Sequence, residues 1–135
     1  GAIGRALLLH ARDIMRTGKR LATAPRTASV REALLVMTRA KCGSVCVLGS
    51  TGKLVGVFTD GDLRRHMTKA GDAVLQLPLA KVMTAKPTTL RENALAVEAL
   101  KIFNTRKIDD LIVVDAQRKP VGLIDSQDLP KLKLA

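Results

Sequence analysis

The sequence predicts a mixed α/β fold in which one small unit, with the order strand, helix, strand, strand, helix, occurs twice. The first observation is an internal match: residues 31–63 align without a gap on residues 97–129, at an offset of 66, and ten of 33 positions are identical. Average composition would give about two or three identities by chance. The second is that both copies show apolar residues at helical spacing, followed by two short β-rich runs. We therefore infer a duplicated unit.

Each copy begins with a short lead-in segment that ends in a methionine, Met15 or Met83. An amphipathic helix follows. In the first copy, Ser29 and Glu32 have the spacing of a capping box, in which each side chain accepts a hydrogen bond from the other residue's amide. The apolar positions of the two predicted helices are Val30, Ala33, Leu34 and Met37, and then Leu95, Ala96, Ala99, Leu100 and Phe103.

Two β-rich runs come next in each copy, and a short polar turn separates them. They are residues 44–48 and 54–58, and then 111–115 and 120–124. Because the runs are so close in sequence, each pair predicts an antiparallel hairpin. A closing helix is expected to begin near Asp60 in the first copy and near Ser126 in the second.

This pattern divides the chain into four parts. They are a linker at 1–10, a first unit at 11–69, a connector at 70–79 and a second unit at 80–135. A single unit of this size buries only about 60% of the surface of its unfolded chain. We therefore expect the two units to cover each other's apolar sheet faces around a pseudo-twofold axis, as one compact α+β (α/β) domain.

The net charge of +11 invites a nucleic-acid partner, but the chain has two Phe and no Trp or Tyr on which bases could stack. The two cysteines, Cys42 and Cys46, lack metal-ligand spacing, so we expect no zinc site and a reducing compartment. No apolar run approaches the ~20 residues that a membrane span needs. We expect a cytoplasmic protein with neither a nucleic-acid nor a membrane partner.

The stretch GVFTDGDLRR, residues 56–65, carries the candidate site. Gly56 lies inside a strand run and recurs as Gly122, which indicates either tight packing by a neighbouring helix or close approach of a ligand. Asp60 suits the N-cap of the closing helix. Amides at that helix N-terminus, with the Thr59 hydroxyl, would favour a phosphate, and Asp62 would accept hydrogen bonds from two sugar hydroxyls. The alternative is that these acids only complement the helix dipole.

The doubled unit, with the motif G-x-x-T-x-x-D at 56–62, resembles a pair of cystathionine-β-synthase (CBS) domains, a Bateman module. The resemblance covers about residues 11–133 and implies that Thr59 and Asp62 touch the phosphate and the ribose of a bound nucleotide. The second copy keeps Asp128, but Asp125 stands where the hydroxyl belongs, and a carboxylate there would repel phosphate.

Residues 5–15, 58–65 and 95–100 are also similar to the C-terminal CBS pair of bacterial D-arabinose-5-phosphate isomerases. Those enzymes carry an N-terminal sugar isomerase domain that interconverts ribulose 5-phosphate and arabinose 5-phosphate, on the pathway to the lipopolysaccharide sugar Kdo. The resemblance implies a regulatory module of such an isomerase, with the isomerase domain as its partner and a homodimer as its assembly. Neither His10 nor His66 has a recognisable catalytic partner, so we expect no catalysis, no catalytic cofactor and no metal.

The family implies AMP, ADP or ATP as ligand, whereas the pathway suggests its nucleotide-sugar product, CMP-Kdo. Arg64 and Arg65 would meet the sugar carboxylate if they turn inward; otherwise they are a solvated helix face. Small residues before the first hairpin leave room for a ligand, whereas acids at the matching positions, Asp109 and Asp110, would repel phosphate. A ligand-free structural module remains an alternative. The candidate ligand-binding residues are Gly43, Ser44, Thr59, Asp60, Gly61, Asp62, Arg64, Arg65 and Asp128.

Overall fold

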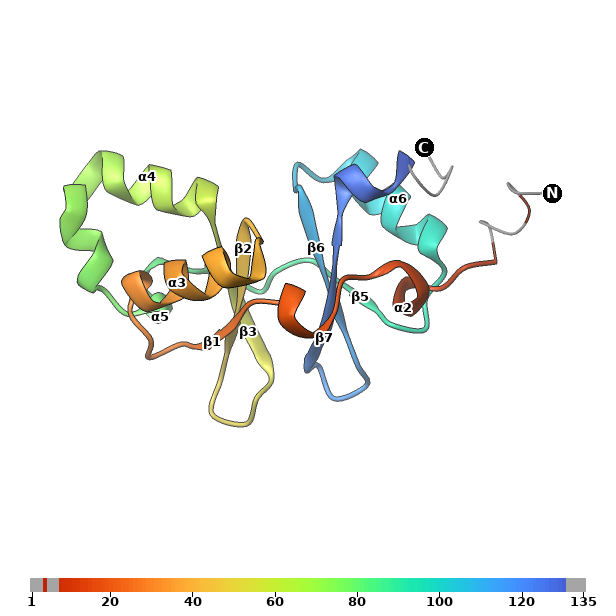
Figure 1. The fold of residues 1–135 in the computed structure, drawn as a ribbon, viewed down its shortest axis with the longest axis horizontal. Helices are drawn as coiled ribbons and strands as arrows, with labels where there is room; N and C mark the ends of the chain where they lie inside the picture. Colours follow the sequence, from red (N-terminus) through yellow and green to blue (C-terminus); the bar gives the residue numbers. More distant parts are fainter. Residues whose placement is uncertain (1–3, 5–7, 131–135) are drawn as a thin grey trace. The chain divides into compact units, whose positions relative to one another are not determined.

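Two spatial units divide the chain: residues 18–87 form one, and residues 1–17 together with 88–135 form the other. The structure is a computed structural model that describes residue 4 and residues 8–130. Each unit contains its own small sheet, β1-β2-β3-β4 in the first and β5-β6-β7 in the second (Figure 1). The predicted mixed α/β fold with a duplicated unit is confirmed.

The unit of residues 18–87 contains both predicted strands of the first hairpin, at almost the predicted bounds. β2 (Ser44–Leu48) pairs antiparallel with β3 (Leu54–Thr59), while β1 (Thr23–Pro25) pairs parallel with β2, and β4 (Thr84–Ala85) lies on the other side of β3. The remaining elements are η1 (Gly18–Arg20), α3 (Val30–Ala40), α4 (Asp60–Ala70), η2 (Gly71–Gln76) and α5 (Leu79–Val82).

Helix α3 begins where the sequence predicts. The hydroxyl of its N-cap, Ser29, accepts a hydrogen bond from the Glu32 amide at 3.1 Å. Among the residues that the structure describes, only this half of the expected capping box forms. The helix ends at Lys41, whose backbone is left-handed with φ 55°.

With 11 residues each, α3 and α4 are short, and no helix in the described part of the chain is long and apolar enough to cross a membrane.

The core of this unit lies on one face of its sheet. Val45, Val47 and Phe58 are fully buried there and pack with the apolar face of α3. Residues 70–79, expected as a connector, are part of the same core: η2 packs on α3 and α4, and Val74 and Leu79 are fully buried. The stretch therefore belongs to the folded unit.

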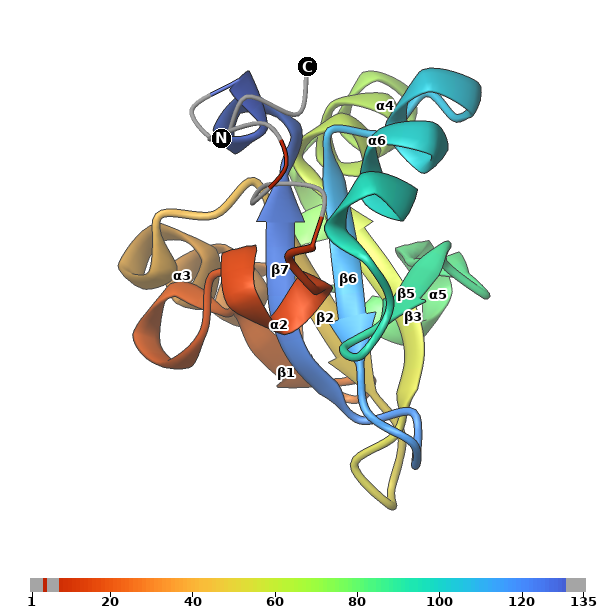
Figure 2. The same ribbon diagram turned by 90° about the vertical axis from the view of Figure 1, so that its right-hand side faces the viewer.

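The other unit repeats the hairpin. β6 (Asp110–Val114) pairs antiparallel with β7 (Pro120–Asp125), and β5 (Thr89–Arg91) pairs parallel with β6. α2 (Ala11–Ile14) contacts α6 (Ala96–Thr105) and β7, and Figure 2 shows α2 in front of these strands. In place of the expected closing helix near Ser126, the described residues form a 3-10 turn, η3 (Ser126–Asp128). Most of the expected linker at 1–10 lies outside the described residues.

The lead-in segments exchange places between the two sequence copies. Residues 11–17, at the start of the first copy, fold with the second, and residues 80–87, at the start of the second, fold with the first. The spatial units therefore group the lead-in residues differently from the sequence copies expected at 11–69 and 80–135. In each unit a strand glycine contacts the methionine of the lead-in segment from the other copy. A Cβ on Gly56 would collide with the Met83 side chain and lie 3.0 Å from the Thr84 carbonyl oxygen, and Gly122 faces Met15 in the same way. The tight approach at Gly56 thus comes from a lead-in segment.

Candidate functional site

The candidate residues gather where β3 ends and β2 begins. Ser44 pairs with Thr59 across the hairpin, one position from the Val45–Phe58 pair. Because side chains alternate along a strand, Ser44 and Thr59 lie on the sheet face opposite to the α3 core. The Asp60 amide donates to the Gly43 carbonyl at 3.0 Å, which fixes the start of α4 against the start of β2.

Thr59, and not Asp60, is the N-cap of α4. The Thr59 hydroxyl accepts a hydrogen bond from the Asp62 amide at 3.1 Å, and the Asp62 carboxylate accepts one from the Thr59 amide at 3.0 Å. The two bonds form a complete capping box. Thr59 has the extended backbone of an N-cap and Asp60 is the first helical residue, so α4 begins where expected and its cap lies one position earlier than expected. Thr59 and Asp62, the two central candidates, therefore hold each other in a fixed geometry.

Asp62 is a buried carboxylate, with only 4% of the residue exposed. The Thr84 hydroxyl donates to its Oδ1 at 3.2 Å, and the Arg65 guanidinium forms an ion pair with the same oxygen. The Arg65 side chain is 67% exposed, so solvent screens its attraction to Asp62. Of the groups that contact the Asp62 carboxylate, the exposed Arg65 guanidinium is therefore the easiest for a hydroxylated ligand to replace, while the Thr59 amide and the Thr84 hydroxyl also hold the carboxylate.

The structure brings most of the candidate set together. Gly43, Ser44, Thr59, Asp60, Gly61, Asp62 and Arg65 meet at the start of α4. Arg64 lies exposed on α4, and Asp128 belongs to the other unit.

Sequence reasoning missed two residues: Thr84, which contacts Asp62 at this site, and Arg16, which lies at the matching place of the other unit. Each follows the lead-in methionine of its copy, Met83 or Met15. The structure pairs Thr84 with Val57 and Arg16 with Leu123, which occupy matching positions in β3 and β7. Extending the methionine match by one position would have identified Thr84 and Arg16 as equivalent residues, but not the strands beside which they lie.

The matching place in the second unit is an ion-pair cluster. Asp128 accepts two hydrogen bonds from Arg16, one from Nε at 2.9 Å and one from Nη2 at 3.1 Å. The same Nη2 lies 3.3 Å from Asp125. Asp125 also caps η3 by accepting from the Gln127 amide at 2.9 Å. The carboxylate at position 125 therefore keeps the capping role of Thr59 but adds a negative charge.

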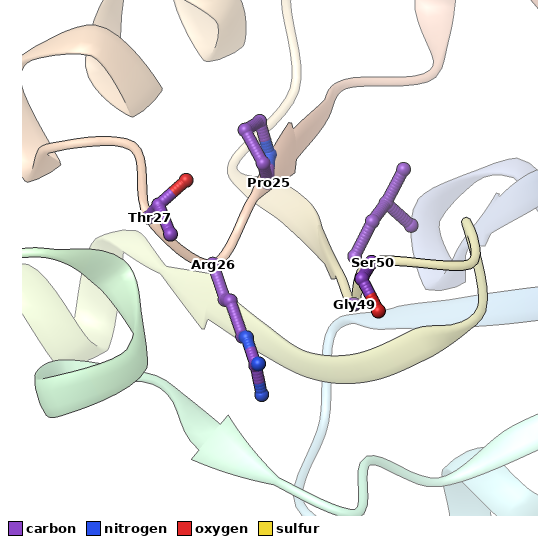
Figure 3. Close-up of a pocket in the computed structure, with 6 residues that line it drawn as sticks. Pro25, Arg26, Thr27, Gly49 and Ser50 are labelled. Carbon is purple, nitrogen blue, oxygen red and sulfur yellow. The ribbon is translucent and has the colours of Figure 1, made fainter.

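A cavity of about 230 Å³ lies at the other end of β2 (Figure 3). It is lined by Pro25, Arg26, Thr27, Leu48, Gly49 and Ser50. Figure 3 shows the Arg26 and Thr27 side chains pointing in different directions, so its polar groups do not converge as those of a binding pocket do. None of the candidate residues lines this cavity.

Charge is distributed unevenly between the units. Residues 18–87 contain twelve Lys and Arg against four Asp and Glu, whereas the rest of the chain contains eleven against eight. The excess of positive charge in the unit that contains Thr59 attracts anions. Over the described residues there is no group of three or more His, Cys, Asp or Glu side chains that could hold a metal ion.

Comparison with known proteins matches the CBS domain family model to residues 11–69 and 79–133. Curated relatives include proteins named arabinose 5-phosphate isomerase KdsD from Pseudomonas aeruginosa, 46% identical over 129 residues, from Escherichia coli K12 at 41% and from Yersinia pestis at 38%. Each match covers 96% of this chain and 39% of the relative. The chain therefore spans well under half the length of these relatives.

Solved structures show the same fold at low identity. A CBS domain-containing protein of unknown function from Bacillus anthracis has a TM-score of 0.83 at 16% identity, covering 97% of this chain and 96% of that one. The CBS pair of MJ0100, solved with 5'-methylthioadenosine and S-adenosyl-L-methionine, has a TM-score of 0.78 at 24% identity, covering 92% and 94%. CBSX2 in complex with AMP has a TM-score of 0.77 at 24% identity, covering 93% and 96%.

Proposed function

Since this chain belongs to the CBS domain family, with one copy at residues 11–69 and another at 79–133, we propose that it is a regulatory module that senses a nucleotide through Thr59 and Asp62. The observation that carries the proposal is the start of α4, where a hydroxyl and a buried carboxylate are fixed side by side. The excess of basic residues in the same unit adds attraction for phosphate.

In this proposal the phosphate lies at the N-terminus of α4. The helix has 11 residues, and its dipole favours an anion at this end. The Asp60 and Asp62 amides already donate to the Gly43 carbonyl and the Thr59 hydroxyl, so the Gly61 amide is the first-turn donor that would meet the phosphate. The Thr59 hydroxyl supplies a further contact, and Asp62 accepts hydrogen bonds from two ribose hydroxyls. Arg65 then leaves Asp62 for solvent or for a second acidic group of the ligand. Since Arg65 is largely exposed, this exchange of partners costs little.

The ligand class is a nucleotide or a nucleotide sugar. AMP, ADP and ATP are candidates because neighbours of the same fold were solved with adenosine compounds. CMP-Kdo is the candidate that fits the relatives named arabinose 5-phosphate isomerase. It is a late product of the Kdo pathway, so its binding would couple the activity of the isomerase to the amount of product. Its sugar carboxylate would take the Arg65 guanidinium released from Asp62, with Arg64 beside it. We propose that ligand binding adjusts the activity of an isomerase domain in the same cytoplasmic protein.

The second candidate function is a structural or dimerisation module that binds no ligand. The completed capping box favours it, because Thr59 and Asp62 already satisfy each other's amides. Size-exclusion chromatography with light scattering tests the expected homodimer with and without nucleotide.

The experiment is a thermal-shift panel with AMP, ATP, CMP, CTP and CMP-Kdo at matched ionic strength, applied to wild type, Thr59→Asp and Thr59→Ser. Both replacements keep a good N-cap, so both variants are expected to unfold close to the wild-type temperature. Thr59→Asp places a carboxylate against the phosphate and should lower affinity at least tenfold, whereas Thr59→Ser keeps the hydroxyl. A ligand at 100 times its dissociation constant adds about 2.7 kcal/mol, which is several degrees.

A larger shift with CMP-Kdo than with CMP supports sensing of the pathway product, and a shift with adenine nucleotides alone supports energy sensing. Equal ligand affinity in Thr59→Asp and wild type would show that the ligand phosphate does not bind at the start of α4. No shift with any compound would favour the structural module.

A further inference from the structure

The two units share a backbone hydrogen bond at matching positions, and this bond serves as a common frame, but the side chains around it differ in charge. The Asp60 amide donates to the Gly43 carbonyl at 3.0 Å, and the Ser126 amide donates to the Asp109 carbonyl at 2.9 Å. At matching positions around this frame, residues 18–87 supply Ser44, Thr59, Asp62 and Thr84, and the other unit supplies Asp110, Asp125, Asp128 and Arg16. Three hydroxyls and one carboxylate in the first unit thus correspond to three carboxylates and one guanidinium in the second.

Arg16 is held at this place by the backbone as well as by charge. Its amide donates to the Leu123 carbonyl at 2.7 Å, and its carbonyl accepts from the Leu123 amide at 3.0 Å. The guanidinium then reaches Asp128 with two nitrogens and Asp125 with one. Only 16% of the Arg16 side chain is exposed, against 21% for Asp128 and 23% for Asp125. A forked, part-buried contact of this kind is stronger and more directional than an exposed ion pair.

The contrast with Arg65 shows what this contact does. In the first unit the cation beside Asp62 is 67% exposed, so a ligand can displace it. In the second unit the cation is part-buried and anchored through its own backbone, so both carboxylate oxygens of Asp128 stay engaged. A ribose could not take Asp128 without breaking two charge-assisted hydrogen bonds, and Asp110 and Asp125 would repel the attached phosphate.

We propose that Arg16 is a specificity-determining residue: its guanidinium occupies Asp128 and so prevents a nucleotide from binding to the second unit. Each chain then binds one nucleotide, at residues 18–87. The inference rests on the proposed function for its ligand. It adds a residue and a stoichiometry that the proposed function does not contain.

Isothermal titration with AMP and with CMP tests it on the full chain. The wild type is expected to bind one nucleotide per chain. A triple variant, Asp110→Ser, Asp125→Thr and Arg16→Thr, gives the second unit the three hydroxyls of the first unit and should bind two. The double variant Asp110→Ser with Asp125→Thr is the matched control: it removes the two repelling carboxylates but keeps Arg16 on Asp128, and it should still bind one.

A triple variant that folds, judged by circular dichroism and cooperative melting, yet still binds one nucleotide overturns the inference, and so does a wild type that binds two. If the wild type binds neither AMP nor CMP, the same titrations with ATP, CTP and CMP-Kdo decide: no binding of any of them contradicts the proposed function. Binding gained by the triple variant alone would still support the role of Arg16, and no binding by either protein overturns the inference, because it assigns one nucleotide to residues 18–87.

The reverse change covers the case in which the triple variant does not fold. Thr84→Arg introduces the clamping residue at an exposed position of the first unit, and Thr84→Ser keeps the hydroxyl as a control. Thr84→Arg is expected to lower nucleotide affinity at least tenfold, and unchanged affinity would overturn the inference.

Discussion

Replacing Gly56 by alanine tests the packing that brings Thr84 to Asp62. The added methyl group would lie 3.0 Å from both Met83 Cγ and the Thr84 carbonyl oxygen, well inside normal contact. Met83 can turn away, but the Thr84 carbonyl belongs to β4, which pairs with β3, so the strand itself must shift. Overpacking of this kind costs about 2 kcal/mol, or roughly 6–10 °C in melting temperature for a chain of this size.

A double-mutant cycle with Met83→Ala separates the collision from other effects of Gly56→Ala. Truncating the half-buried Met83 alone should cost about 1–2 kcal/mol, but it also leaves space for the new methyl group. The double variant is therefore expected to lose at least about 1 kcal/mol less than the sum of the single variants, measured by urea unfolding. Gly61→Ala is the control: its Cβ meets nothing closer than 3.4 Å, and alanine in a helix should be neutral or stabilising. Additive losses at Gly56 and Met83 would refute the reasoning.

Three further changes test other features of the fold. Ser29→Ala removes the cap of α3 and should cost about 1 kcal/mol in urea unfolding, and an unchanged midpoint would mean that this bond does not stabilise the helix. Arg118→Gly should raise the melting temperature by roughly 2 °C, because Arg118 has φ 64° where the first copy has Gly52 with φ 82°; a lower temperature would contradict this. Phe58→Ala empties a fully buried site and should cost about 3–5 kcal/mol, seen as lost cooperativity in circular dichroism unless the core closes over the gap.

The parts of the fold that depend on local pattern were predictable from the sequence. The hairpins followed from two β-rich runs around a short turn, and α3 followed from Ser29 and the apolar spacing behind it. The stretch at 70–79 was not predictable, because its polar and glycine residues resemble a connector although Val74 and Leu79 are fully buried. The exchange of lead-in segments was also not predictable, since Arg16 and Asp128 are 112 positions apart and no local sequence pattern connects them.

The candidate site was predictable where one motif carries it. Thr59 and Asp62 were identified from spacing, and the structure adds that they cap each other. Thr84 reaches the same carboxylate from a strand of two residues, which is too short to leave a periodic signal. The cap itself was misplaced by one residue because Thr and Asp are both good N-caps, and only the extended backbone at Thr59 decides between them.

The exchange of lead-in segments also sets an order in which the protein can fold while it is being made. Residues 18–87 are complete as soon as β4 has been synthesised, so this unit can form first. Arg16 is synthesised before that unit, yet its partner Asp128 follows 112 residues later, roughly 6 to 22 s at ordinary rates of translation. During that interval α2 and Met15 have no strand to pack on. A nascent chain therefore carries an unpaired segment that fits β7 of another copy whose own lead-in segment has not yet docked, which is the situation in which domain swapping begins.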